Sequence, residues 1–215
     1  GIEGNFIGGH PMAGSEKTGL ENSKRHLIEN AYYVITPTGK VPAEAVEDYV
    51  EFIGSLKALP LVLDYKQHDY ITAAISHLPH LIAAGLVNLV KHNDCKEQYM
   101  KTVAAGGFKD ITRIASSSPV MWEQICMTNH ENISQLLGKY IESMQEIKDS
   151  LDQVRGQDIY DLFEESREYR NSITDVSHGP IKKAYVLYAD MADETGGIAT
   201  VATTLACTQI TLKHI

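Results

Sequence analysis

Basic side chains are scarce in this sequence of 215 residues. The 19 Lys and Arg residues are outnumbered by 28 Asp and Glu residues, and the formal net charge is −9. Nucleic acids and anionic membrane surfaces bind basic patches, so we expect neither as a partner. The three cysteines, Cys95, Cys126 and Cys207, lie far apart and form no C-x-x-C pair. This spacing favours a reduced, cytoplasmic setting over a disulfide framework.

Long apolar runs are also lacking. The longest, LPHLIAAGLVNLV at 78–90, is interrupted by His80 and is shorter than the roughly 20 residues that span a bilayer. We therefore expect no transmembrane segment, and no signal peptide is apparent. The chain begins without Met, inside a strand-like stretch, so we expect further residues upstream. Its hydrophobic share of 43% and charged share of 22% are typical of a soluble globular protein of one or two domains.

The first 65 residues alternate strand and helix patterns. The stretches NFIGG, AYYVITP and LPLVLD predict three short strands, and residues 15–28 predict either a short helix or a loop. A helix is predicted from Pro42, because proline suits the first helical turn and the acidic residues that follow favour the helix dipole. The order strand, helix, strand is typical of an α/β sheet.

The middle of the chain is helical in pattern. Residues 68–93 predict one long apolar helix kinked at Pro79, which removes a backbone hydrogen bond. A short helix follows a Gly-Gly pair. Pro119, preceded by Ser118 as N-cap, then begins a helix predicted to run past Asp149. Its apolar residues step by four and three alternately, which is typical of a helix that packs lengthwise on another. These residues are Ile133, Leu137, Tyr140, Met144, Ile147 and Leu151.

The last part of the chain changes pattern again. Gly156 separates the long helix from a further helix that reaches about Ile173. Residues 183–215 then show a strand, a helix after a Gly-Gly turn and a second strand, which is a βαβ-like arrangement. The predicted fold is therefore mainly α, with the end of an α/β unit before the helices and a shorter α/β unit after them.

One histidine stands in an unusual setting, in the stretch GGHPMAGSEKTG at 8–19. Two glycines precede His10 and give the backbone freedom, while Pro11 biases His10 toward extended angles. A histidine held on such a loop can exchange protons near neutral pH. A turn residue without a chemical role fits the same pattern about equally well.

Two further histidines, His77 and His80, lie three residues apart beside Pro79. The spacing places them near one face of a helix, as part of a site or as ordinary core or surface residues. It differs from the i, i+4 spacing of the H-E-x-x-H zinc helix, and no cysteine or acidic cluster completes a ligand set. We therefore expect no metal.

Lys109 and Arg113 form a cationic pair at i, i+4. Like charges at this spacing repel unless an anion lies between them, and an arginine fork matches a carboxylate. A ligand with two carboxylates would suit the pair, while a solvated basic face partly neutralised by Asp110 is the simpler interpretation. Trp122 follows, and a lone tryptophan is more often a core or interface residue than part of a site.

Three stretches, GGHPMAGSEKTG, HDYITAAISHLPH and GGFKDITRIASSSPVMW, occur in this order, and together they resemble the prephenate dehydrogenase family over nearly the whole chain. The resemblance implies the C-terminal part of a Rossmann nucleotide-binding domain at 1–65 and a helical dimerisation and substrate-binding domain at 66–180. Residues 183–215 resemble the start of an ACT domain. The G-x-G-x-x-G fingerprint of the nucleotide site is absent, so we expect a fragment that is inactive alone.

The family reaction is the NAD-dependent oxidative decarboxylation of prephenate to 4-hydroxyphenylpyruvate in tyrosine biosynthesis. The resemblance makes His10 the catalytic base, which takes the proton of the ring hydroxyl while hydride leaves for the nicotinamide. It makes Arg113 the residue that binds a prephenate carboxylate. The remaining roles that it implies are substrate binding by His80, Lys109, His77 and Ser15, an ionic network of Glu16 and Asp110 with Arg113, and contact of Trp122 with the neighbouring subunit's site.

Several alternatives stay open at this point. Arogenate could replace prephenate as the substrate, and NADP could replace NAD, because the cofactor-binding residues lie mostly upstream of residue 1. The resemblance implies a homodimer and makes tyrosine a candidate feedback inhibitor at the ACT-like unit. A protein of another class, a non-catalytic dimerisation and tyrosine-sensing module, also fits the sequence.

Overall fold

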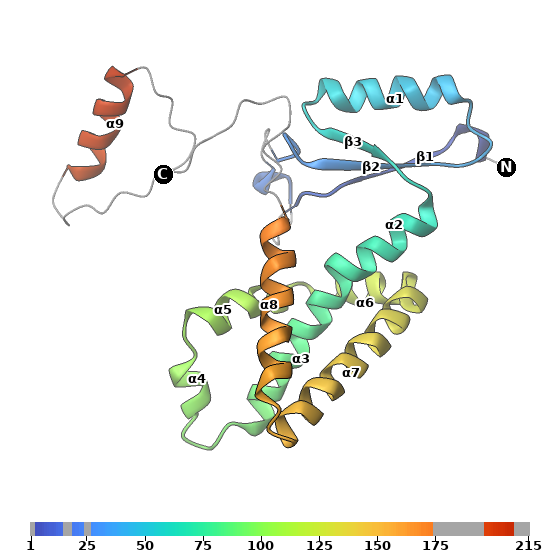
Figure 1. The fold of residues 1–215 in the computed structure, drawn as a ribbon. Helices are drawn as coiled ribbons and strands as arrows, with labels where there is room; N and C mark the ends of the chain where they lie inside the picture. The colour runs from blue at the N-terminus through green and yellow to red at the C-terminus, as the bar shows by residue number, and fades with distance from the viewer. Residues whose placement is uncertain (1–2, 15–18, 24–26, 174–195, 209–215) are drawn as a thin grey trace.

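The computed structural model describes residues 3–14, 19–23, 27–173 and 196–208. It is mainly helical, with one small sheet near the start of the chain (Figure 1). This agrees with the class expected from the sequence. Ser15 and Glu16 lie outside the described residues, as does most of the ACT-like unit. Of that unit the structure describes helix α9, Gly197–Cys207, which follows Gly196 in the left-handed conformation expected of a Gly-Gly turn.

The three strands predicted from the sequence are confirmed, and they form one sheet in the order β1-β2-β3. Strand β1 (Ile7–Pro11) pairs antiparallel with β2 (Tyr32–Pro37), and β2 pairs parallel with β3 (Leu59–Val62). Helix α1 (Ala43–Ser55) connects the two parallel strands and lies along the sheet in Figure 1. Short 3₁₀ turns, η1 (Glu3–Asn5) and η2 (Leu20–Asn22), precede and follow β1.

The core of this unit lies between the sheet and α1. Ile35 of β2 and Ile53 of α1 are fully buried with Ala58, and Tyr33 and Tyr49 pack at the edge of this cluster. Helix α1 begins after Pro42, whose φ of −58° is already helical, with Glu44 in its first turn. The helix predicted from Pro42 is therefore confirmed.

Gly9 of β1 lies directly beneath two tyrosines. A Cβ atom at Gly9 would be 2.7 Å from the Tyr33 hydroxyl oxygen and 2.8 Å from that of Tyr49. The two hydroxyl oxygens are 3.1 Å apart, and their hydrogen bond raises the pKa of Tyr49 to about 12. The second glycine of the GGH stretch is thus needed for close approach of the tyrosines.

One rod of 29 residues leaves the sheet, from Tyr65 to Asn93. It consists of α2 (Tyr65–Thr72), one π-helical turn, η3 (Ala73–His77), and α3 (Leu78–Asn93). The Asp64 carboxylate caps it by accepting from Lys66 N–H at 2.9 Å. Pro79 stands in the first turn of α3, and the Leu78 N–H donates to the Ala73 carbonyl across the π turn. The helix thus absorbs the proline by a π turn and does not end there.

The long apolar helix predicted over residues 68–93 is confirmed, and it begins at Tyr65. By length and composition alone this rod could cross a membrane, with a mean hydropathy of 1.5. Helices at the core or interface of globular proteins meet the same test, and α3 contacts α5 and α7 in this chain.

Short helices follow α3 and turn back along it, as Figure 1 shows: α4 (Tyr99–Val103), α5 (Gly106–Thr112) and the 3₁₀ turn η4 (Arg113–Ser116). Helix α6 (Pro119–Thr128) begins as predicted, with the Ser118 hydroxyl accepting from Met121 N–H at 3.5 Å.

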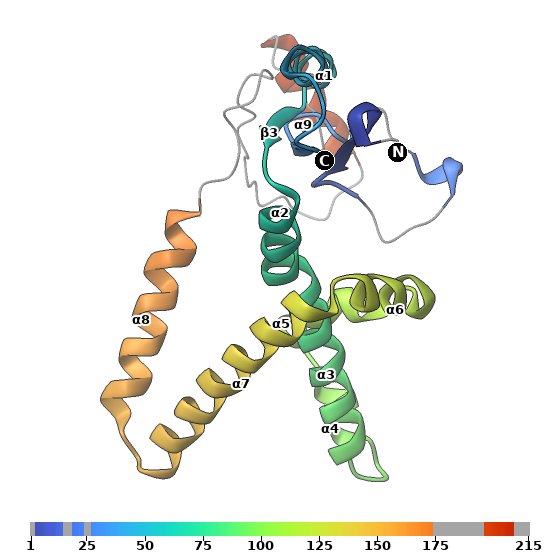
Figure 2. The same ribbon diagram turned by 90° about the vertical axis from the view of Figure 1, so that its right-hand side faces the viewer.

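The prediction of one continuous helix from Pro119 past Asp149 is wrong at Asn129. The helix breaks at this residue, whose ψ of 29° is not helical, and α7 (His130–Asp152) leaves in another direction (Figure 2). The predicted break near Gly156 is confirmed, because α8 (Gly156–Ser172) starts there. The Arg155 guanidinium and the Ser150 hydroxyl both contact the Asp158 carboxylate at this second corner.

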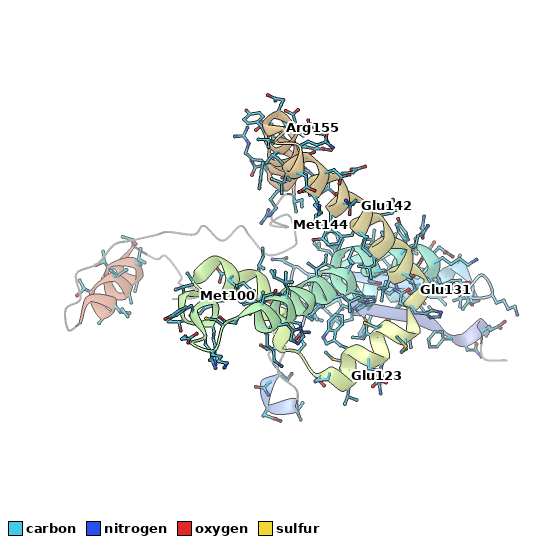
Figure 3. The ribbon with its side chains drawn as sticks, turned by 90° about the horizontal axis from the view of Figure 1, so that it is seen from below. Met100, Glu123, Glu131, Glu142, Met144 and Arg155 are labelled. Carbon is cyan, nitrogen blue, oxygen red and sulfur yellow. The ribbon has the colours of Figure 1, made fainter. Side chains whose placement is uncertain are left out.

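The pair of helices α7 and α8 forms an arm. In Figure 3, Glu131 lies near the other helices, whereas Met144 and Arg155 lie farther out along the arm. Ile133 is buried at the base of α7, but Met144 is 40% exposed and Leu151 is 59% exposed. The apolar stripe predicted on α7 is therefore only partly covered by this chain.

The cysteines Cys95, Cys126 and Cys207 are all free, in agreement with the sequence.

Candidate active site

Four histidines gather where the sheet meets the long helical rod. His10 comes from β1, His68 from α2, His77 from η3 and His80 from α3. His10 and His68 are in direct contact, and the electrostatic influence of His10, His68 and His80 reaches His77. The sequence predicted His10, His77 and His80 as site residues, and the structure places them in the same region.

His10 contacts a histidine that sequence reasoning overlooked. Its Nδ1 atom lies 2.8 Å from Nε2 of His68, with the two rings edge to face. On the other side of the His68 ring, Nδ1 lies 2.9 Å from Oδ1 of Asp69. A carboxylate, an imidazole and a second imidazole thus stand in one hydrogen-bonded series.

His77 is held by the break between α6 and α7. The Asn129 side-chain amide donates to the Asp69 carbonyl at 2.7 Å and lies 3.3 Å from His77 Nδ1. The Asn132 amide donates in turn to the Asn129 side-chain oxygen at 2.8 Å. Asn129, at the break between α6 and α7, therefore helps to orient His77.

His80 stacks on Trp122. The ring centroids are 3.7 Å apart with an interplanar angle of 24°, while His77 meets the same indole edge to face. His80 Nδ1 donates to the Ser76 carbonyl at 2.9 Å, because a carbonyl oxygen can only accept. This bond leaves Nε2 of neutral His80 as an acceptor. The buried Trp122 Nε1 has no hydrogen-bond partner within the described ranges.

The cationic pair lies on a neighbouring element. Lys109 is on α5 and Arg113 begins η4, and both segments pack along α3, which carries His80. Both side chains are exposed, whereas Thr112 between them is buried and its hydroxyl donates to the Phe108 carbonyl. The buried threonine holds this segment against α3. The cations thus lie on segments that pack against the helix of His80.

Burial lowers the pKa of His10, with His68 as a smaller cause, and it also lowers the pKa of His77. A lowered pKa keeps an imidazole neutral near pH 7, with a free lone pair for a proton. Asp69 acts in the opposite direction on His77, as a nearby carboxylate must. The cluster therefore offers neutral bases where the sheet meets the rod. Among the described residues, no three His, Cys, Asp or Glu side chains are grouped in a way that could hold a metal ion.

Sequence reasoning missed His68, Asp69 and Asn129. The first two belong to the polar stretch from Lys66 to Asp69 in the first half of α2. Nothing in this local pattern distinguished them from an ordinary exposed helix start. Asn129 gave no signal, because it lies inside a region with an unbroken helical pattern.

Two family models match this chain. Residues 2–61 match the prephenate dehydrogenase nucleotide-binding domain, and residues 64–165 match the prephenate dehydrogenase dimerization domain. The boundary between the two matches falls between β3 and α2, so the histidine cluster draws residues from both sides of it.

Similar proteins carry the same name. The chain is 37% identical over 98% of its length to a prephenate dehydrogenase of Bacillus subtilis, and 34% identical over 98% to one of Lactococcus lactis. It spans 57% of the length of each of these relatives. A crystal structure of prephenate dehydrogenase from A. aeolicus, in complex with hydroxyphenyl propionate and NAD+, matches 80% of this chain and 60% of its own at 31% identity and a TM-score of 0.76.

Proposed function

The chain belongs to the prephenate dehydrogenase family, and we propose that it serves the NAD-dependent oxidative decarboxylation of prephenate to 4-hydroxyphenylpyruvate. The observation that carries this proposal is the cluster of His10, His77 and His80 at the meeting point of the two matched regions. The chemistry needs a neutral base and anion-binding groups. The cluster supplies the base, and Lys109 and Arg113, on segments that pack along the helix of His80, are the proposed anion-binding groups.

His10 is the proposed base. Its pKa is lowered by burial, so the ring is neutral near pH 7 and can take the proton of the substrate's ring hydroxyl. Removal of that proton favours oxidation of the carbon that bears the hydroxyl. Loss of carbon dioxide then makes the ring aromatic, which drives the overall reaction forward.

Arg113 and Lys109 are the proposed anchors of the substrate. Prephenate carries two carboxylates, and an arginine fork binds one of them through paired hydrogen bonds. The support for this role is their position along α3, on the helix that carries His80. His77 and His80 both contact Trp122, which stacks on the His80 ring.

NAD is the proposed hydride acceptor. The match of residues 2–61 to a nucleotide-binding domain supports a dinucleotide, and a similar structure is a complex with NAD+. The sequence contains no G-x-G-x-x-G turn, so residues 1–215 offer a pyrophosphate no such cradle. Helix α1 begins instead with Glu44, which would repel a phosphate. The roles proposed for this chain's own residues therefore concern the substrate.

We also propose a homodimer built by the helical region. The match to a dimerization domain supports it, as do the exposed apolar side chains of the α7–α8 arm. On α7 these include Ile141, Met144 and Leu151, and on α8 Tyr160, Phe163 and Tyr169. A face of this kind is typically covered by another chain.

The proposed division of the chain is 1–65, 66–180 and 183–215, and the two family matches support the first boundary. Tyrosine would act as a feedback inhibitor at the third unit, of which α9 is the described helix.

The free cysteines support a reduced, cytoplasmic setting.

Replacement of the base tests the function. In the full-length protein, His10→Asn should lower kcat with prephenate by about 10²–10⁴-fold while prephenate binding stays nearly unchanged. His92→Asn, an exposed position at the end of α3, is the matched control and should keep full activity. An unchanged kcat for His10→Asn would contradict the proposal. Parallel assays with arogenate would show which of the two substrates is preferred.

A further inference from the structure

The series Asp69–His68–His10 points to a role for a residue pair outside the roles described above. We propose that His68, held by Asp69, is a positioning residue that fixes His10 in the tautomer with hydrogen on Nδ1, so that Nε2 is the atom that accepts the substrate proton. This inference rests on the proposed function of His10 as the base. It names the reacting atom and the residues that select it.

The first step of the argument concerns Asp69. An ionised carboxylate can only accept hydrogen bonds. Its Oδ1 lies 2.9 Å from Nδ1 of His68. His68 must therefore carry a hydrogen on Nδ1, and when neutral it has a lone pair on Nε2.

The second step passes this constraint to His10. His68 Nε2 lies 2.8 Å from His10 Nδ1. Since the His68 atom is the acceptor, the hydrogen of this bond must belong to His10 Nδ1. A neutral imidazole carries one hydrogen, so Nε2 of His10 holds the free lone pair.

The third step is that His68 is itself firmly placed. Its side chain is only 18% exposed. Its main-chain N–H donates to the Asp64 carbonyl at 2.9 Å, and its carbonyl accepts from the Thr72 hydroxyl at 3.0 Å. Asp64 also caps the helix. The ring that selects the tautomer is therefore held at the first turns of α2, at low entropic cost when the base reacts.

Burial, and to a smaller extent His68, disfavour the protonated form of His10, and the Asp69 carboxylate behind His68 offsets part of this cost. The Nδ1–H of the His10 imidazolium still donates to His68, and the Asp69 carboxylate lies behind that ring. A negative charge at this position stabilises the cation through the intervening imidazole. His77, the other titratable group near His10, is neutral because its pKa is lowered, so it adds little repulsion.

The tautomer can be read directly by long-range ¹H–¹⁵N correlation spectra of the full-length protein labelled with ¹⁵N-histidine. At neutral pH, His10 should show the Nδ1–H pattern in the unaltered protein. In His68→Leu it should shift toward the Nε2–H form that free imidazole side chains prefer. His68→Gln, whose amide oxygen can accept near the position of Nε2, should restore the Nδ1–H form, and His92→Leu should leave it unchanged.

Kinetics give the second readout. His68→Leu should lower kcat about 10-fold to 100-fold, less than loss of the base itself, with little change in KM. His68→Gln should recover part of the loss. An Nε2–H pattern for His10 in the unaltered protein would overturn the inference. It would also be overturned if both the His10 tautomer and kcat were unchanged in His68→Leu. If His68→Leu does not fold, the His10 tautomer in the unaltered protein and in His68→Gln still tests the inference.

The two proposals fail differently. Failure of the unaltered full-length protein to oxidise prephenate would refute the proposed function, whereas full kcat in His10→Asn would refute the role of His10 as base and with it the positioning role of His68. An inactive His10→Asn enzyme, combined with full kcat in His68→Leu, would leave the function intact and refute the positioning role alone.

Discussion

The side-chain amide of Asn129 donates to the main-chain carbonyl of Asp69 across 2.7 Å, although the two residues are 60 positions apart. The bond ties the break between α6 and α7 to the rod that carries three of the four histidines. The same amide group lies 3.3 Å from His77 Nδ1. One side chain thus joins the interhelical corner to the candidate active site.

Asn129→Ala should lower the free energy of unfolding by about 1–3 kcal/mol, because it removes the contacts of the amide with the Asp69 carbonyl and with His77 Nδ1, each worth about 0.5–1.5 kcal/mol. The Asp69 carbonyl keeps the Thr72 hydroxyl and the Ala73 N–H as donors. Urea unfolding followed by circular dichroism would measure this loss. Asn93→Ala is the control: Asn93 is exposed and donates only to the Leu89 carbonyl of its own helix, so its effect should stay within about 0.5 kcal/mol. Equal effects of the two variants would contradict the role of Asn129.

Gly9→Ala should destabilise the sheet unit by about 1–3 kcal/mol, since the added methyl group would overlap the hydroxyl groups of Tyr33 and Tyr49. The matched control is Gly54→Ala in α1, where no atom lies within 4 Å of the new methyl group. That change should stabilise the protein by up to about 1 kcal/mol, because alanine favours a helix over glycine. Thermal unfolding of both variants would check the opposite signs.

Stability should fall as the pH drops through the histidine range. His10 and His77 have pKa values below 6.5 in the folded protein and about 6.5 when unfolded, so the unfolded state binds more protons in that interval. The free energy of unfolding therefore decreases from pH 6.5 downward and is unaffected by these groups above it. Urea unfolding of the protein and of His77→Gln at several pH values would test this. The variant should show a weaker decline, and an equal decline would speak against it.

Arg113→Leu should raise KM for prephenate about 10-fold to 150-fold, which corresponds to about 1.5–3 kcal/mol for a lost charge-assisted contact. The effect on kcat should be smaller, because the contact exists in the ground state and in the transition state alike. Steady-state kinetics of the full-length protein would measure both constants. Arg170→Leu, at an exposed arginine in the last turn of α8, should change neither. Normal affinity in Arg113→Leu would remove that residue from the site.

Met144→Lys should weaken the homodimer, since it places a charge in the exposed apolar stripe of α7. Light scattering at micromolar concentration should show monomers at concentrations where the unaltered protein is dimeric. Gln145→Lys adds the same charge one residue along the helix, where the lysine could still pair with Asp149. This control should remain dimeric. A monomeric unaltered protein would defeat the prediction before any variant is made.

Local patterns predicted most of the elements. The strands around His10, Val34 and Leu61 and the helix after Pro42 could be read from short stretches, because alternation and helix-start signals act between near neighbours. The helix cap at Ser118 was predicted for the same reason. The break at Asn129 was not predicted, since the helical pattern on both sides of it is continuous. The hydrogen bond of Asn129 at this break is to a carbonyl 60 positions away.

The sequence by itself determined the mainly helical class, the family resemblance and the three histidines at positions 10, 77 and 80. Only the tertiary structure decided that His68 and Asp69 stand behind His10, that Trp122 covers His80, and that the rod passes through Pro79 by a π turn. The physical reason is the range of the interactions. Propensity and periodicity act within a few residues, whereas a histidine's tautomer depends on whichever group the fold brings within about 3 Å of its ring.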